Sequence, residues 1–100
     1  MQRRLPPLNS LRAFESAARL LSFTRAADEL SVTQSAVSHQ VKALEDWAGI
    51  PLFRRDGRQV ALTEAAAKFL PTVTAALDQI ALAGRKLQAV DPGQGWLTVA

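Results

Sequence analysis

The chain has 100 residues, of which 48% are hydrophobic, so it carries enough apolar material for the core of one small domain. It contains no cysteine, which excludes disulfides and thiolate metal sites. No run approaches the roughly 18–20 apolar residues of a membrane span, and residues 1–7 are not followed by the apolar segment of a secretory signal. We therefore expect a cytoplasmic protein without a membrane partner.

The net charge of +3 is modest, but the charges are unevenly distributed. Residues 30–44 contain no carboxylate, while Arg54, Arg55 and Arg58 lie close together with a single acid, Asp56. Basic patches beside an acid-free surface indicate a polyanionic partner. A polar face exposed to water can have the same composition, so the charge pattern alone leaves both interpretations open.

Apolar residues at helical spacing predict a first helix over residues 10–21, after an irregular arm that ends at Pro6 and Pro7. Asn9 or Ser10 is expected to cap this helix, because a short polar side chain can accept a hydrogen bond from a free backbone N–H. The apolar stripe of the helix consists of Leu11, Phe14, Ala17, Ala18 and Leu21.

A short second helix is predicted to follow, with Thr24 as its N-cap. A turn at residues 31–33 then leads into a third helix over residues 34–47, which Thr33 caps and Gly49 ends. Two helices joined by so short a turn form a helix-turn-helix. The inward-facing residues of the short helix are predicted to be Ala26, Ala27 and Leu30.

A hairpin is predicted after the third helix. Asp56 and Gly57 lie between two short apolar segments, residues 52–53 and 60–62. An Asp-Gly pair flanked by β-forming residues is typical of a tight hairpin, because the turn needs positive φ angles. The sequence therefore predicts a small two-stranded wing with residues 54–59 at its tip.

The last predicted helix is long. Thr63 is expected to cap it, and it runs to about residue 89 with a kink at Pro71, because a proline inside a helix removes one backbone hydrogen bond. Its apolar positions alternate at spacings of four and three, which is the heptad pattern of helices that pair with each other. We assign dimerisation to Phe69, Val73, Ala76, Leu77, Ile80 and Leu87.

Together these elements predict a mainly α fold, in which three helices and a two-stranded wing form a winged helix-turn-helix and a long dimerisation or linker helix follows. We divide the chain into residues 1–62 for the winged helix-turn-helix and residues 63–90 for the long helix. Residues 91–95 are rich in helix breakers, and residues 96–100 resemble a strand. We expect residues 91–100 to be a hinge and the first strand of a further domain.

The third helix has two chemically different faces. Val37, Val41 and Leu44 form an apolar face toward the first helix. The opposite face offers an amide, hydroxyls, an imidazole and an ammonium group from Gln34, Ser35, Ser38, His39 and Lys42. Gln pairs with adenine through two hydrogen bonds, and the free N–H groups of a helix start bind phosphate. We predict that this face reads the major groove of DNA, and that Arg58 reaches the backbone or the minor groove.

The sequence fits two other classes of protein, enzymes and pure interaction modules, less well. In an enzyme, His39, the only histidine, would need a carboxylate to orient it, and none lies nearby in the sequence. The sequence also has no Gly-rich phosphate loop and no metal-ligand spacing. A pure interaction module would use the heptad helix alone. Acidic residues on the outer face of the third helix would favour such a module, but we expect none on that face. We therefore expect no enzyme, no metal and no cofactor.

Several short motifs, in this order, resemble the amino-terminal domain of LysR-type transcriptional regulators. They lie at residues 8–14, 22–27, 30, 32–38, 44–45, 49–55 and 62–65, and the match covers roughly residues 5–90. Each motif is weak alone, but the ordered set is specific. The opening at residues 4–9 and the run at residues 38–42 resemble the branch of glycine-cleavage activators, which also includes β-lactamase regulators.

The resemblance implies a bacterial homodimer or dimer of dimers, whose long helices pair antiparallel and whose third helices enter successive major grooves of an inverted-repeat promoter site. For the full-length protein it also implies a carboxy-terminal domain that binds a small-molecule effector, contacts with RNA polymerase and association with the nucleoid. Many members carry Arg where His39 stands, which leaves the base preference at that step open. With the charge pattern, the resemblance assigns DNA contacts to Thr33, Gln34, Ser35, Ser38, His39, Lys42, Arg54, Arg55 and Arg58.

Overall fold

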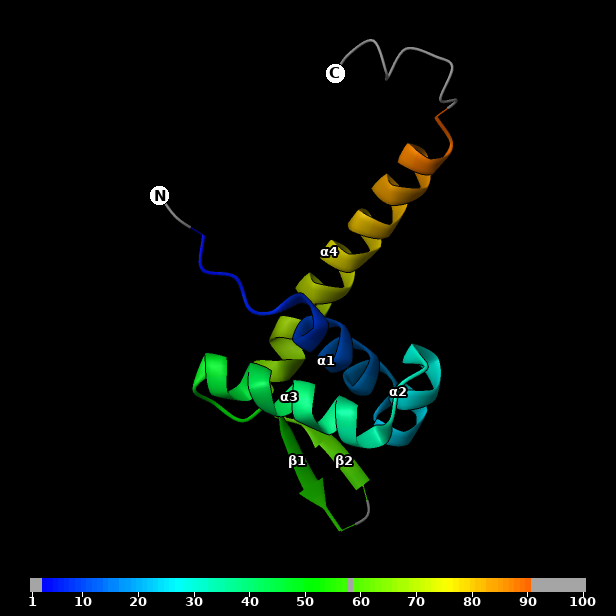
Figure 1. The fold of residues 1–100 in the computed structure, drawn as a ribbon. Helices are drawn as coiled ribbons and strands as arrows, with labels where there is room; N and C mark the ends of the chain where they lie inside the picture. Colours follow the sequence, from blue (N-terminus) through cyan, green and yellow to red (C-terminus); the bar gives the residue numbers. More distant parts are fainter. Residues whose placement is uncertain (1–2, 58, 91–100) are drawn as a thin grey trace.

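The computed structural model describes residues 3–57 and 59–90, and these residues form four helices and one two-stranded antiparallel sheet (Figure 1). The predicted fold class is confirmed. In chain order the elements are α1 (Leu8–Leu20), α2 (Phe23–Leu30), α3 (Gln34–Ala48), β1 (Phe53–Asp56), β2 (Gln59–Leu62) and α4 (Glu64–Gln88).

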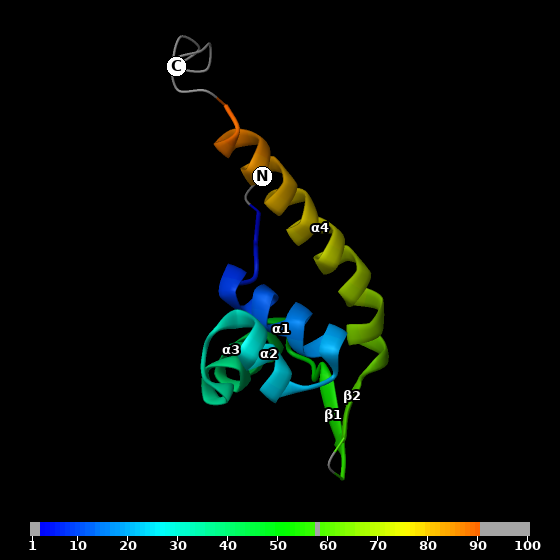
Figure 2. The same cartoon turned by 90° about the vertical axis from the view of Figure 1, so that its right-hand side faces the viewer.

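The three short helices form one body, and two elements extend from it. The β1–β2 hairpin and α4 leave this body in opposite directions (Figures 1 and 2). The first part of α4 packs beside α1 before the helix leaves the body. The predicted hinge and first strand, residues 91–100, lie outside the described residues.

The start of α1 differs from the prediction. The helix begins at Leu8, two residues earlier than expected, and Pro7 is its N-cap without any side-chain cap bond. Ser10 does not cap the helix, because its buried hydroxyl donates to Gln40 Oε1 on α3 at 3.0 Å. Asn9 lies inside the helix and accepts from Arg12 instead. A tertiary contact has thus replaced the local cap that the sequence suggested.

The ends of α1 and α2 also correct two assignments. Leu21, placed in the apolar stripe from its spacing, is 51% exposed and ends α1 with a φ of 50°. Ser22, not Thr24, caps α2, because its side chain accepts from the backbone N–H of Arg25 at 3.0 Å. Thr24 lies one residue inside the helix, which frees its hydroxyl for another partner.

The caps of α3 and α4 are confirmed. Thr33 accepts from the backbone N–H of Ala36 at 3.0 Å, and Thr63 accepts from that of Ala66 at 3.3 Å. Gly49 ends α3 with a φ of 78°, a conformation that costs little only for glycine. These three ends fix the length of α3 and the start of α4.

The core consists of two clusters that meet at the base of the hairpin. Phe53, at the start of β1, packs against both clusters and lies 5.8 Å from the Phe14 ring and 5.2 Å from the Phe23 ring. β1 and β2 pair with Phe53 opposite Leu62. Gly57 supplies the positive φ of 63° that the turn requires. The predicted wing is therefore present and is held to the core at its base.

α4 continues as one helix on both sides of Pro71. Pro71 has no N–H to offer the carbonyl of Ala67. Both residues are exposed, so water can take the place of the missing donor. The opposite face of this segment carries Ala66 and Val73, which are 0% and 4% exposed in the core. Packing on that face favours the helix despite the proline.

Candidate nucleic-acid interface

The two faces predicted for α3 are present. Val37, Val41 and Leu44 are 1–3% exposed and pack in the two core clusters. On the other side, Ser35 and His39 are exposed and Ser38 is half-buried. These polar residues follow helical spacing, so they lie along one side of α3. The burial of the apolar face keeps the polar face turned outward.

Two polar contacts fix α3 relative to its neighbours. The part-buried Ser10–Gln40 hydrogen bond joins α3 to α1. At the carboxyl end of α3, Glu45 Oε2 accepts from the backbone N–H groups of Leu52 and Phe53 at 2.7 and 3.4 Å. The second contact ties the start of β1 to α3. It therefore sets where the wing lies relative to the polar face.

The amino end of α3 contains a contact that the sequence analysis missed. Thr24 Oγ1, on α2, donates to Gln34 Oε1 at 3.1 Å, and both side chains are exposed. One acceptor site of the Gln34 carbonyl is thereby used, while its second acceptor site and its NH₂ group still face solvent. Thr24 thus orients the side chain that was predicted to read a base. The sequence shows the Thr24 hydroxyl, but it predicts a helix cap for this hydroxyl and not the contact with Gln34.

Thr33 and Lys42 lie at opposite ends of the same polar face. The Thr33 hydroxyl accepts as a cap, which leaves its own hydrogen free to donate. Lys42 Nζ pairs with Asp46 Oδ1 at 2.9 Å, and this pairing raises the pKa of Lys42. The outer face of α3 is therefore acid-free only as far as Lys42, contrary to the expectation that it carries no acid. A phosphate at Lys42 would have to compete with Asp46.

The two arginines of β1 point to opposite faces of the hairpin. Successive residues of a strand alternate between faces, so Arg55 shares the face of Phe53 and Arg54 does not. The Arg55 guanidinium lies 5.7 Å from the centre of the Phe23 ring on α2. The arginines that are close together in the sequence are therefore separated in the fold, because Arg55 lies against the body and Arg54 points away from it. The prediction for Arg58 lies outside the described residues.

The apolar stripe of α4 is also divided. Phe69 and Val73 face the core of their own chain, with Phe69 5.6 Å from the Phe14 ring and Val73 4% exposed. Leu77 is half-buried at the edge of this core. Ile80 and Leu87 are 62% and 69% exposed. The first two residues assigned to dimerisation therefore serve internal packing, and the later ones remain uncovered.

Within residues 3–57 and 59–90, no group of three or more His, Asp or Glu side chains gathers where it could hold a metal ion. Over the same residues no helix has both the length and the hydropathy needed to cross a membrane.

A helix-turn-helix with a polar outward face on its second helix, followed by a hairpin anchored beside it, defines a winged helix-turn-helix DNA-binding domain. Residues 8–67 match the family model of bacterial regulatory helix-turn-helix proteins of the lysR family. The chain belongs to this family, and it is the DNA-binding domain of a LysR-type transcriptional regulator.

Relatives among characterised proteins agree with this assignment. Over its whole length the chain is 54% identical to the "Glycine cleavage system transcriptional activator" of Escherichia coli strain K12, and the match covers 32% of that protein. Over 75% of its length the chain is 57% identical to the "HTH-type transcriptional activator AmpR" of Pseudomonas aeruginosa, and this match covers 25% of that protein. The chain thus spans about a third or less of the length of these relatives. They are transcriptional regulators, and this domain is not an enzyme.

Solved structures share the fold. In the complex of BenM_DBD with benA site 1 DNA, the protein is 30% identical to this chain, with a TM-score of 0.76 over 88% of this chain and 99% of that one. The oxidised form of OxyR from Corynebacterium glutamicum is 31% identical, with a TM-score of 0.80 over 89% of this chain and 27% of that one. The first of these structures is a complex with DNA.

Proposed function

We propose that this chain binds an inverted-repeat site in promoter DNA as a homodimer, with α3 in the major groove and the hairpin at the minor groove or backbone. The observation that carries the proposal is the outward face of α3. It is polar, free of carboxylates from residue 34 to residue 44, and fixed by buried contacts on its other side. A recognition helix needs both an inner face that is packed firmly on the domain and an outer face that is rich in hydrogen-bond donors.

The residues of this face take different roles in the proposal. Gln34, Ser35, Ser38 and His39 lie on the amino-terminal half of α3, the half that contacts base edges in helix-turn-helix proteins. Gln34 has both an acceptor and donors available for an adenine. Thr33 and Lys42 contact phosphate oxygens, which position the helix without reading sequence.

The hairpin contributes positive charge beside the groove. Arg54 faces away from the protein body and is exposed, so it is free to reach phosphate. Arg55 stacks on Phe23, and its charge acts from a fixed position. Arg58 follows Gly57 at the tip of the predicted wing, where an arginine suits a narrow minor groove.

Dimerisation involves the uncovered half of α4. Ile80 and Leu87 expose large apolar side chains at helical spacing, with Ala76 and Leu77 on the same side. Burying each of the two large side chains would stabilise a dimer by about 1.5–3 kcal/mol. Two α4 helices packed antiparallel would bury all four residues. Phe69 and Val73 would support this interface from inside each protomer.

The full-length protein would be a bacterial transcriptional regulator of the cytoplasm, because its relatives are named as transcriptional activators. By the same likeness we propose a small-molecule effector site outside residues 1–90, contacts with RNA polymerase and association with the nucleoid. The domain itself needs no cofactor in this proposal. The same proposal divides the chain into a winged helix-turn-helix at residues 1–62, a linker and dimerisation helix at residues 63–90, and the start of a further domain at residues 91–100.

Selection of bound fragments from a random duplex pool, at two salt concentrations, tests the proposed function. We expect an inverted repeat to emerge, and affinity to fall steeply with salt because bound phosphates release counterions. Gln34→Ala should change the base preference within each half-site, while Lys68→Gln, on the exposed side of α4, should leave it unchanged. Weak, sequence-blind binding by the unmodified chain at both salt concentrations would contradict the proposal.

A further inference from the structure

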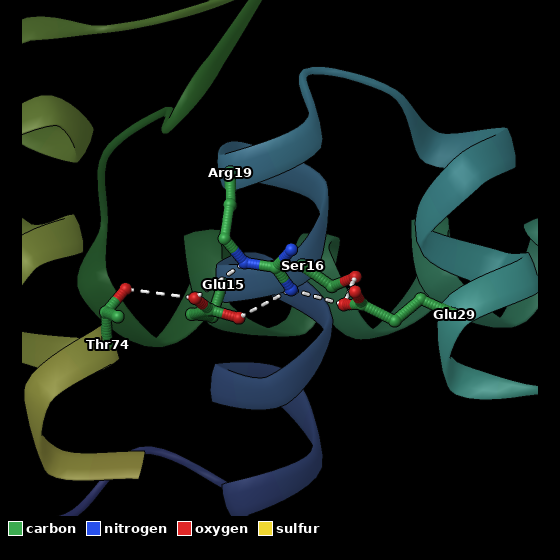
Figure 3. Close-up of polar contacts among 5 residues, drawn as sticks. All are labelled: Glu15, Ser16, Arg19, Glu29 and Thr74. Atoms are coloured by element: carbon green, nitrogen blue, oxygen red, sulfur yellow. Dashed lines mark hydrogen bonds and ion pairs between the residues drawn. The ribbon is translucent and has the colours of Figure 1, made fainter. Parts of the chain in front are cut away.

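A cluster of polar side chains joins three helices at the place where α4 leaves the body (Figure 3). Its members are Glu15, Ser16 and Arg19 on α1, Glu29 on α2 and Thr74 on α4. We call it the Glu15 cluster. None of its residues lies on the polar face of α3, so the proposed reading of bases does not use it.

Glu15 is at the centre of this cluster. Its Oε2 accepts from Thr74 Oγ1 at 3.0 Å and from Arg19 Nε at 3.1 Å, and its Oε1 accepts from Arg19 Nη2 at 3.3 Å. Arg19 also pairs with Glu29, which accepts from Ser16 Oγ at 2.6 Å. The pairing with Arg19 holds the pKa of Glu29 below its usual value. The cluster therefore connects α4 through α1 to α2.

The Glu15 carboxylate has little freedom to move. Its side chain is 12% exposed, against 43% for Arg19 and 40% for Glu29. Carboxylate oxygens with so little contact with water need protein hydrogen-bond donors, and here one of those donors is Thr74. Among the described residues, this is the side-chain hydrogen bond that joins α4 to the helix-turn-helix. A hydrogen bond has a preferred direction, whereas the neighbouring apolar contacts do not.

Thr74 lies at a mechanically sensitive point of α4. Val73, one residue earlier, is 4% exposed, while Ile80, Leu82 and Leu87 beyond it are 46–69% exposed. From Thr74 to the end of α4 there are fourteen residue steps, or about 21 Å of helix. A tilt of about 10° at Thr74 would move the far end by about 4 Å, close to the roughly 3.4 Å that each base pair adds along the DNA helix axis.

We propose that the Thr74–Glu15 hydrogen bond is a specificity-determining contact that sets the angle between α4 and the helix-turn-helix, and so the spacing of the two half-sites that the dimer accepts. This inference rests on the proposed function, because spacing has meaning only for a dimer on two half-sites. Thr74 is a positioning residue here, since it touches no DNA. Base preference within a half-site belongs to α3 and is independent of it.

The test is a competition among duplexes that contain the selected half-sites separated by spacers differing by one base pair. We expect the unmodified chain to prefer one spacer, and Thr74→Val to reduce that preference about fivefold with unchanged half-site sequences. Thr74→Ser retains the hydroxyl and should restore the preference. Thr72→Val makes the same isosteric change on α4 at an exposed threonine outside the Glu15 cluster, and should have no effect. An unchanged spacer preference in a folded Thr74→Val variant would overturn the inference.

A second measurement separates this inference from the proposed function. The chain has no cysteine, so Asp28→Cys on α2 and Lys86→Cys on α4 give two unique sites for spin labels at exposed positions. With excess unlabelled chain, the measured distance lies within one chain. Thr74→Val should widen the distance distribution and Thr74→Ser should not. An unchanged width overturns the inference even if no inverted repeat is found, whereas a failure of the unmodified chain to select a repeat counts against the proposed function alone.

Discussion

The hydroxyl of Thr24 donates to Gln34 Oε1 at 3.1 Å and so links the first turn of α2 to the first residue of α3. The two residues are ten positions apart, and the turn of the helix-turn-helix brings them together. Gln34 is thereby held at one of its two carbonyl acceptor sites. Its NH₂ group and second acceptor site keep a defined orientation toward the proposed major groove.

The first prediction concerns this pair. Thr24→Val removes the donor at nearly constant volume, and it should weaken discrimination at the base read by Gln34 by about 0.5–1 kcal/mol, the net value of a typical hydrogen bond. Gln34→Ala should cost about 1–3 kcal/mol at the same base. Competition between duplexes that differ at one base pair measures both. Thr24→Ser is the control, and equal discrimination by Thr24→Val and the unmodified chain would show that Thr24 does not orient Gln34.

The second prediction concerns the Lys42–Asp46 ion pair. Because both side chains are mostly exposed, the pair adds little to folding stability, but Asp46 competes with phosphate for the ammonium group. Asp46→Asn should therefore raise affinity for DNA at low salt and steepen the dependence of log K on log salt by up to about one unit. Lys42→Gln should flatten it by a similar amount. A salt series for each variant measures these slopes. Slopes identical to that of the unmodified chain would show that Lys42 does not contact DNA.

The third prediction separates the two halves of the stripe on α4. Val73→Ala should lower the free energy of unfolding by about 2 kcal/mol at every protein concentration, because its methyl groups fill the core of one chain. Ile80→Glu should leave that core intact and instead place a charge in the proposed dimer interface. Sedimentation and denaturant unfolding at several concentrations measure the two effects. An intact dimer of Ile80→Glu would exclude this part of α4 from the interface.

The fourth prediction is a pH dependence of stability. The pKa of Glu29 in the folded protein lies below its ordinary value of 4.5, chiefly because of Arg19. Its pairing therefore stabilises the fold fully above about pH 4.5, and this contribution is lost as the pH falls through the folded pKa. Since Glu29 is 40% exposed, solvent screening limits the effect to at most about 1 kcal/mol.

Thermal unfolding between pH 3 and pH 7 tests this pH dependence. Glu29→Gln should lose stability at neutral pH and show a weaker decline in acid than the unmodified chain. Glu64→Gln, in an ion pair whose Glu side chain is 85% exposed, is the control and should decline like the unmodified chain. Parallel declines for all three proteins would show that Glu29 gains nothing from Arg19.

The sequence predicts well the features that depend on neighbouring residues. Thr33 and Thr63 cap their helices because the N–H groups they accept from are three positions away. Gly49 and Gly57 adopt positive φ angles, as the helix end and the hairpin require. Helix periodicity is equally local, which is why the two faces of α3 were predicted correctly.

The features that failed depend on contacts across the chain. Ser10 and Thr24 have the side chains of good caps, but partners thirty and ten positions away use their hydroxyls instead. Val73 matches a heptad seam, yet the core of its own chain already buries it. Glu45 gave no sequence signal for holding the start of β1. Periodicity identifies an apolar face, but it does not say which surface covers that face.

Phe53 packs against both core clusters at the base of the hairpin. The two halves of the core therefore cannot separate without exposing the same aromatic ring, which makes the body a single cooperative unit. Backbone amides at the base of the hairpin, such as that of Thr63 bonded to Leu52, would exchange their hydrogens only when the whole domain unfolds. Amides toward the tip would exchange through local opening, so the hairpin can adapt to a bound surface without loosening the core.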